Sequence, residues 1–230
     1  VSTYHSDITC QILHRQVAPW VLGVEFSDLD DLLDLVAERE HNFPGSYLRR
    51  AMGGFDTAVW DLWGKQAGKP VVTLMGGKPG KLRVYASSMR RDITPVEEAE
   101  RLIALQQKFG YNAFKVRAGA EVGRNKDEWP GRTEEIIPVM RKYLGDTSDL
   151  LIDANSCYSP NKAIEVGNLL EDNGFSHFEE PCPYWELEQT KMVTDALTID
   201  VTGGEQDCDL STWKRMIDMR AVDIVPVSYT

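Results

Sequence analysis

The sequence predicts an α/β fold with a parallel sheet in its larger, C-terminal part. From about residue 82 onward, short apolar or β-branched runs alternate with amphipathic helical patterns. Such alternation is typical of βα units, in which helices connect parallel strands. The preceding residues show only helical patterns. We therefore expect two domains, residues 1–80 and residues 81–230.

The first of these regions is predicted to be helical. One helix is expected from Ser27 to about Val36, because Ser27 is a capping residue and acidic residues fill the first turn. A second helix follows residues 44–46, with apolar residues at steps of three and four that are typical of core packing. Residues 68–70, Gly-Lys-Pro, end this helix, and the glycines and proline at 76–80 predict a linker.

Six short runs predict the strands of the second region. They are residues 82–86, 113–117, 150–153, 177–180, 199–202 and 222–225. Helical patterns lie between them, at about 94–109, 132–143, 160–173, 185–197 and 210–219. Strands that are connected in this way by helices run parallel in one sheet.

Composition excludes several classes of function. The chain has 25 Lys and Arg against 36 Asp and Glu, a net charge of −11, which argues against a nucleic-acid surface. No run approaches the ~18 apolar residues of a membrane span, and the first residues carry no signal-peptide pattern. The four cysteines (Cys10, Cys157, Cys182 and Cys208) include no CxxC pair, so we expect free thiols in a cytoplasmic protein.

Acidic residues recur at the predicted ends of successive strands. Asp153, Glu179 and Glu205 are spaced 26 residues apart. One such residue per βα unit predicts three carboxylates on one rim of a closed barrel, the face where (β/α)₈ barrels keep their active sites. Three converging carboxylates repel each other, and Mg²⁺, which prefers hard oxygen ligands, relieves the repulsion. The alternative is that each residue only caps a helix or lies in solvent.

Polar and basic residues accompany these carboxylates. Lys115 and Arg117 are two positions apart on one strand, so both side chains point to the same side of the sheet. Facing the barrel mouth, they would neutralise charge that develops on a substrate carboxylate. The alternative is an exposed basic pair. Asn155 follows Asp153 by two residues and is placed to hydrogen-bond a substrate.

Together these features resemble the enolase superfamily, mandelate racemase/muconate lactonizing branch, from about residue 17 onward. The matching segments are 46–51, 56–65, Lys115-x-Arg117, Asp153-x-Asn155, Glu179-Glu180-Pro181 and Gly204-Glu205. The resemblance implies a modified TIM barrel, with about six strands present, beside the helical part of an α+β capping domain. It also implies an essential Mg²⁺ bound by Asp153, Glu179 and Glu205, a small carboxylate substrate, and a homo-oligomer.

The sequence also differs from the family pattern. Members usually carry Lys-x-Lys where this chain has Lys115-x-Arg117, and an arginine, which stays protonated, is a poor base. A racemase needs two opposed bases, whereas an elimination needs one, so the arginine favours an acid-sugar dehydratase. The residues flanking Pro226 differ from the usual Gln and Asp, and the family's strand-seven His lies beyond Thr230. We expect a truncated chain here rather than a barrel that has lost its His–Asp dyad, because an open barrel exposes strand edges.

The sequence therefore predicts a Mg²⁺-dependent lyase that dehydrates a sugar acid by abstracting the proton α to the carboxylate, through an enediolate. Lys115 and Arg117 are the predicted catalytic residues, and with Asn155 they are predicted to bind the substrate. A racemase, epimerase or cycloisomerase of the same branch stays open as an alternative, as does a catalytically incomplete remnant. Because the general base is expected beyond residue 230, we expect this chain to be inactive by itself. The residues do not indicate which acid sugar is the substrate.

Overall fold

The computed structural model describes residues 5–26 and 28–225. The chain forms two compact units, of which the first consists mainly of the residues up to Leu82 and the second mainly of those from Arg83 onward. Ser27, expected as a helix cap, and the residues from Pro226 onward lie outside the described residues. Within the described ranges, no helix combines the length and the apolar character needed to cross a bilayer.

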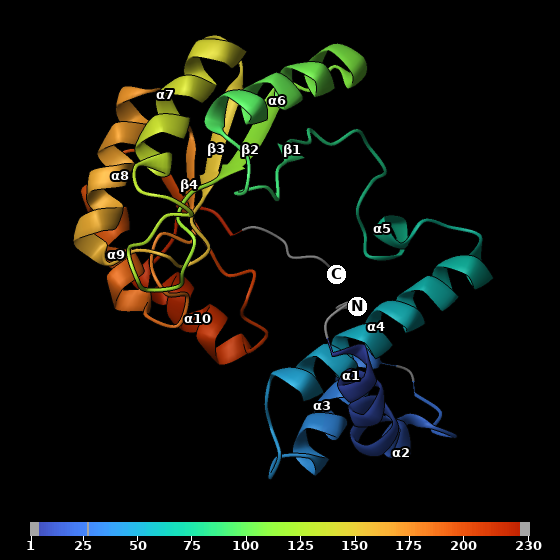
Figure 1. The fold of residues 1–230 in the computed structure, drawn as a ribbon. Coiled ribbons are helices and arrows are strands. Elements are labelled where there is room, and N and C mark those ends of the chain that lie inside the picture. Colours follow the sequence, from blue (N-terminus) through green and yellow to red (C-terminus); the bar gives the residue numbers. More distant parts are fainter. Residues whose placement is uncertain (1–4, 27, 226–230) are drawn as a thin grey trace. The chain divides into compact units, whose positions relative to one another are not determined.

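The first unit is helical, as expected (Figure 1). Its elements are α1 (Ser6–Ile12), the π-helical turn η1 (Leu13–Val17), α2 (Ala18–Val21), α3 (Leu29–Arg39), α4 (Ser46–Ala67) and α5 (Val71–Leu74). Helix α3 is capped by Asp28, whose side chain accepts a hydrogen bond from the Asp30 N–H. Helix α4 ends at Gly68, which adopts the left-handed conformation with φ of 63°.

The core of the first unit joins three segments of the chain. Its buried residues are Val17, Val36, Leu48, Ala51 and Met52. The stripe predicted on α4 supplies the last part of this core, but Leu62 of the same stripe is 52% exposed. The stripe on α4 is therefore buried or partly buried as far as Val59, but not at Leu62.

The second unit is a five-stranded parallel sheet with the order β1-β2-β3-β4-β5. Its elements are β1 (Ala86–Ser87), α6 (Pro95–Phe109), β2 (Ala113–Arg117), α7 (Arg132–Leu144), β3 (Asp149–Asp153), α8 (Pro160–Asp172), β4 (His177–Glu179), α9 (Leu187–Ala196), β5 (Asp200–Thr202) and α10 (Leu210–Met219). Helices α6 to α9 lie along the outside of the sheet (Figure 1). The α/β architecture predicted from the alternating pattern is confirmed.

Two predicted strands differ from the structure. The first, expected at 82–86, is reduced to Ala86–Ser87, and Leu82 and Val84 are exposed. The sixth, expected at 222–225, is present in the described residues only as a parallel bridge between Ile224 and Thr202. Both segments have the alternation of a strand, but each pairs with one neighbouring strand at most, so few backbone hydrogen bonds hold them.

The two faces of the sheet differ in character. Alternate strand residues pack against the helices in one apolar core: Phe114, Val116, Leu150, Ile152, Phe178 and Val201, together with residues such as Leu102, Ile136, Leu170 and Val193. The residues between them point to the opposite, inner face. The inner face carries the charged residues that the sequence singled out.

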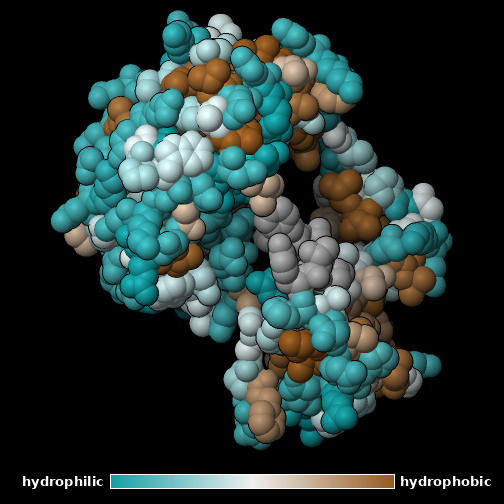
Figure 2. Space-filling view, viewed as in Figure 1, coloured by the Kyte–Doolittle hydropathy of each residue, from teal (hydrophilic) through white to brown (hydrophobic). Residues whose placement is uncertain are grey.

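The face of the molecule in Figure 2 is mainly hydrophilic, with apolar residues in separate areas. Exposed apolar side chains occur in both units and include Leu22 and Phe43 in the first and Met89 and Ile217 in the second. Single exposed apolar residues are common on protein surfaces and do not by themselves indicate a binding site.

Candidate active site at the carboxyl ends of the strands

Strand register places three of the predicted site residues in one row across the sheet. Arg117 on β2 pairs with Asp153 on β3, which pairs with Glu179 on β4. Each is the last residue of its strand. Their side chains are almost entirely buried, with exposures of 2%, 0% and 4%. Lys115 lies two residues before Arg117 on β2, so it faces the same inner side of the sheet, and it is also buried.

These residues form a connected set of ion pairs. Arg117 Nη1 donates to Asp153 Oδ2, and Lys115 Nζ donates to Glu179 Oε2. Lys115 Nζ also lies 3.7 Å from Asp153 Oδ2. The expected alternative, a basic pair exposed to solvent, is therefore wrong for the side chains of Lys115 and Arg117, because both face inward onto carboxylates.

Burial and charge act against each other in this set. Burial raises the pKa of Glu179, with the Asp153 charge adding to the rise and Lys115 opposing it. For Lys115, burial alone would lower the pKa, but the carboxylates of Glu179 and Asp153 outweigh it and raise the pKa. The cluster thus holds closely spaced charges with little water to screen them, as is typical of active sites.

Glu205, the third predicted metal ligand, follows β5 by three residues. It is partly exposed, and its Oε1 accepts a hydrogen bond of 3.2 Å from Gln206 Nε2. The preceding Gly204 has φ of 117°, and a Cβ there would lie 2.8 Å from the Trp213 ring. Only glycine fits this turn without strain. Glu205 lies close enough for its charge to raise the pKa of Glu179 and Glu180.

The three carboxylates fit a divalent cation by their chemistry. As the side chains stand, no group of three His, Cys, Asp or Glu among the described residues is arranged to hold an ion, since Asp153 and Glu179 are turned onto Arg117 and Lys115. Glu179 nevertheless keeps a buried oxygen, Oε1, for which the described structure gives no hydrogen-bond partner. Hard oxygen donors on neighbouring strand ends, one of them with a buried oxygen that has no other partner in the described structure, suit Mg²⁺ by their chemistry.

Asn155, just after β3, connects this set to β2 and to the loop after β1. Its backbone N–H donates to Asp153 Oδ1 at 2.8 Å, and its Nδ2 donates to Asp153 Oδ2 at 3.2 Å. Its Oδ1 accepts from Arg117 Nη1 at 2.9 Å and from Arg91 Nη2 at 2.6 Å. Asn155 also has a left-handed backbone, φ 42°. Left-handed backbone at non-glycine residues is found where surrounding structure fixes a functional site.

Two further residues, to which the sequence assigned no role, also belong to this site. Glu180 is 4% exposed, and its Oε1 has no hydrogen-bond partner among the described residues. Burial, together with the charges of Asp153 and Glu205, raises the pKa of Glu180 to about 8. Arg132 is fully buried and donates to the Arg117 carbonyl at 2.8 Å. Only Glu180, inside the motif Glu179-Glu180-Pro181, had a signal in the sequence.

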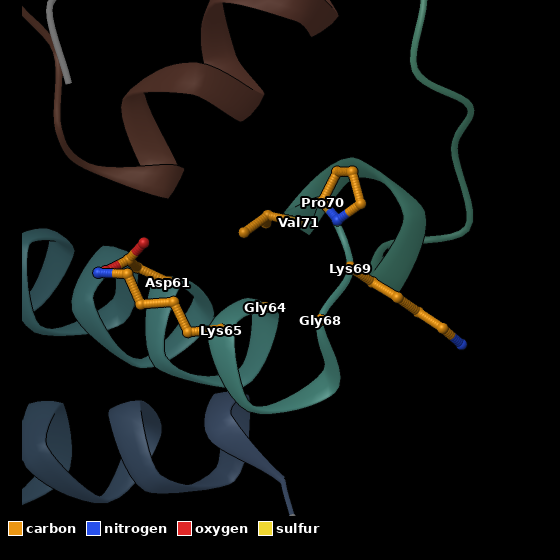
Figure 3. A pocket seen from close by; sticks show the side chains of 7 residues that line it. All are labelled: Asp61, Gly64, Lys65, Gly68, Lys69, Pro70 and Val71. Carbon is orange, nitrogen blue, oxygen red and sulfur yellow. The ribbon is translucent and has the colours of Figure 1, made fainter.

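A pocket of about 360 Å³ lies away from this site, at the turn between α4 and α5 (Figure 3). It is lined by Asp61, Gly64, Lys65, Gly68, Lys69, Pro70 and Val71. Lys65 and Asp61 pair with each other at 2.5 Å on an exposed surface, and Lys69 points away from the other labelled side chains. This pocket therefore lacks the convergent, unpaired polar groups of a reaction site.

Comparison with known families identifies the family of the chain. Residues 95–230 match the family described as enolase C-terminal domain-like, and residues 4–76 match the N-terminal domain of mandelate racemase and muconate lactonizing enzymes. The chain belongs to the mandelate racemase/muconate lactonizing branch of the enolase superfamily, as the motifs predicted.

Solved structures support the same conclusion. A candidate racemase from Roseobacter denitrificans is 75% identical, with a TM-score of 0.96 over 99% of this chain and 62% of that one. A mandelate racemase/muconate lactonizing protein from Paracoccus denitrificans, solved with magnesium, is 30% identical, with a TM-score of 0.87 over 95% of this chain and 59% of that one. The predicted fold, part of a modified TIM barrel, is confirmed.

Curated relatives have several activities. Arabinonate dehydratase of Saccharolobus solfataricus is 31% identical over 76% of this chain and 45% of its own length. L-Ala-D/L-Glu epimerase of Clostridium acetobutylicum is 30% identical over 96% of this chain and 59% of its own length. The chain thus spans about half the length of these relatives, and they include both a dehydratase and an epimerase.

Proposed function

We propose that the protein is a Mg²⁺-dependent lyase that dehydrates a sugar acid. The observation that carries the proposal is the buried Arg117, which lies on the inner face of the sheet in the same row as Asp153 and Glu179. Several curated relatives are acid-sugar dehydratases, among them the arabinonate and D-gluconate/D-galactonate enzymes. We propose the same class of reaction for this protein.

In the proposed reaction, a base removes the proton from the carbon next to the substrate carboxylate. The hydroxyl group on the following carbon then leaves and takes up a proton to form water. The resulting enol tautomerises to a 2-keto-3-deoxy acid, so all atoms are accounted for. When bound by Asp153, Glu179 and Glu205, Mg²⁺ would supply positive charge next to the substrate carboxylate.

The chain's own cations orient the substrate and stabilise charge. Lys115 and Arg117 are proposed to donate hydrogen bonds to the substrate carboxylate as negative charge develops on it, a role that preorganised donors fill in many active sites. Asn155, held by Asp153 and Arg117, fixes the arrangement of these donors. The general base is proposed to lie on a later strand of the barrel.

Arg117 favours elimination over racemisation. A guanidinium stays protonated at ordinary pH and cannot accept the proton that a second, opposed base must take. An elimination needs one base and a proton donor for the leaving hydroxyl group, and Arg117 can donate hydrogen bonds to that group.

A racemase or epimerase is the second candidate. The observation in its favour is the candidate racemase of Roseobacter denitrificans, which is 75% identical to this chain over the aligned residues. Both reactions begin with removal of the same proton, so the two candidates share the metal ligands and differ only in the later steps. The chain's fold is compatible with either.

The remaining proposals concern organisation. We propose that residues 1–80 belong to the capping domain and residues 81–230 to the barrel domain, and that the protein is a cytoplasmic homo-oligomer. Light scattering coupled to size-exclusion chromatography of the complete gene product tests the oligomer. A monomeric mass would contradict it.

The test of the reaction is a screen of the complete gene product against a library of acid sugars with Mg²⁺. Dehydration predicts a 2-keto acid product, which can be detected after derivatisation of its new carbonyl group. Incubation in D₂O in parallel identifies the second candidate, because a racemase incorporates deuterium at the α carbon without loss of water. Exchange without any keto product across the library would contradict the lyase proposal.

A further inference from the structure

Three cations form a row along the inner side of the candidate site. Lys115, at the buried end, pairs with Glu179 and lies 3.7 Å from Asp153 Oδ2. Arg117 comes next and pairs with Asp153. Arg91, from the loop after β1, is last and shares the acceptor Asn155 Oδ1 with Arg117.

Arg91 differs from the other two cations in its partners. All of its hydrogen bonds in the described structure go to neutral oxygens: Gly119 O at 2.7 Å, Ala118 O at 3.5 Å and Asn155 Oδ1. Among the described residues it forms no ion pair, and no hydrogen bond of its Nη1 is found there. Lys115 and Arg117, in contrast, are each paired with a carboxylate.

An unpaired, partly buried guanidinium destabilises the folded chain unless an anion binds to it. Burial, with the nearby positive charge of Arg117, lowers the pKa of Arg91, and the more distant charge of Asp153, which forms no ion pair with it, offsets this only in part. A partly buried charge without a counter-ion loses hydration that neutral acceptors restore only in part. The position of Arg91 in the row is therefore suited to a negatively charged ligand.

The guanidinium of Arg91 is also held in place before any ligand binds. Its acceptor Gly119 is fixed by hydrogen bonds from the Gly119 N–H to Asp127 Oδ1 and Thr133 Oγ1, both 3.1 Å. A Cβ at Gly119 would lie 2.5 Å from Cys157 Sγ, so the loop backbone is packed tightly there. A donor that is already oriented loses little entropy when it binds a carboxylate.

We propose that Arg91 binds a second carboxylate of the substrate, at the end of the substrate remote from the reacting carbon, so that the preferred substrates are sugar diacids rather than monoacids. This inference rests on the proposed function, because it takes the first carboxylate to lie beside Lys115 and the carboxylate triad. The first carboxylate occupies the buried end of the row, where exposures are 4% for Lys115 and 2% for Arg117. Arg91, which is partly exposed, receives the far end of the substrate.

The test measures affinity rather than turnover, so it does not depend on the reaction. Equilibrium binding by calorimetry compares galactarate with galactonate, which differ only in having a carboxylate or a hydroxymethyl group at C6, in the presence of Mg²⁺. Glucarate and gluconate form a second pair. We expect the chain to bind one of the diacids roughly tenfold more tightly than its matched monoacid, about the value of one charge-assisted hydrogen bond.

Three variants locate this preference. Arg91→Gln should abolish the preference for the diacid, and Arg91→Lys, which keeps the charge, should retain part of it. Arg90→Gln is the matched control, since Arg90 is exposed and pairs with Asp92, and it should keep the full preference. Thermal unfolding of each variant shows that it is folded.

The outcomes separate this inference from the proposed function. An equal loss of affinity for diacid and monoacid in Arg91→Gln would mean that Arg91 only positions Asn155, and would overturn the inference. Absence of a diacid preference in the unaltered chain, or of any diacid binding, would overturn it too. If the diacid preference depends on Arg91 but the complete gene product only exchanges the α proton, the inference stands and the lyase proposal fails.

Discussion

The two faces of the five-stranded sheet are made by the same strands but have opposite roles. The outer face packs Phe114, Ile152 and Phe178 against the helices in one apolar core. The inner face buries Arg117, Asp153 and Glu179 in ion pairs. Burial of apolar groups stabilises the fold, whereas burial of ion pairs is at best weakly favourable because desolvation opposes it. Because side chains alternate along each strand, the outer face contributes stability and the inner face carries the reactive groups. Substitutions on the two faces should therefore have different effects.

The largest effect is expected on the outer face. Phe178→Ala should lower the free energy of unfolding by about 3–5 kcal/mol, since it leaves a cavity in the apolar core. Urea unfolding measures the change. Phe109→Ala is the control, because Phe109 is 60% exposed, and it should change the free energy by less than about 0.5 kcal/mol. A loss below about 1 kcal/mol for Phe178→Ala would show that the outer face does not carry the stability.

On the inner face, Lys115→Met should cost about 3 kcal/mol, because it leaves buried carboxylates without their cation. The cost should depend on pH. Burial and Asp153 already raise the pKa of Glu179, and loss of Lys115 raises it further. The folded state then holds a proton that the unfolded state releases, so stability falls as pH rises above about 4.5.

Urea unfolding at about pH 5 and about pH 8 checks this sign. The difference between the unaltered chain and Lys115→Met should be larger at the higher pH. Lys65→Met removes an exposed lysine that pairs with Asp61 and should have little effect at either pH. If Lys115→Met lowers the free energy of unfolding equally at both pH values, the carboxylates of the inner face do not interact with Lys115.

Arg117→Lys should affect the reaction more than the fold. In the complete gene product we expect kcat to fall by roughly 10²-fold, in line with loss of one preorganised donor at a developing charge. The new lysine can act as a weak base on the opposite face, so slow deuterium exchange or epimerisation at the α carbon should appear by NMR. A variant as fast as the unaltered enzyme, without new exchange, would remove the main argument for a dehydratase.

Much of the fold could be predicted from local pattern. Strand β2 was predicted to the residue, because its apolar and charged side chains alternate within one short run. The equal spacing of Asp153, Glu179 and Glu205 reflects one residue per βα unit, and the structure brings the first two into direct register. Strand β1 could not be bounded, since its predicted start at Leu82 has no partner strand in the described residues and is exposed.

The rest of the site depends on contacts between distant residues. Arg91 reaches Asn155, which lies 64 positions away, and Lys115 reaches Glu179 over the same separation. Nothing in the sequence near Arg91 distinguishes it from Arg90, yet one lies in the site and the other pairs with Asp92 at the surface. The burial of Glu180 depends on a left-handed turn, φ 43°, that a single sequence does not indicate.

The central claim is that Asp153, Glu179 and Glu205 bind one Mg²⁺, and the thermal shift with Mg²⁺ tests it most directly. At a concentration of about 100 times Kd, binding to the native state alone should add about 2.7 kcal/mol and raise Tm by several degrees. Glu205→Gln should lose this shift, whereas Glu165→Gln, which alters an exposed residue paired with Lys162, should keep it. An unchanged Mg²⁺ shift in Glu205→Gln, or no shift in the unaltered chain, would contradict the account.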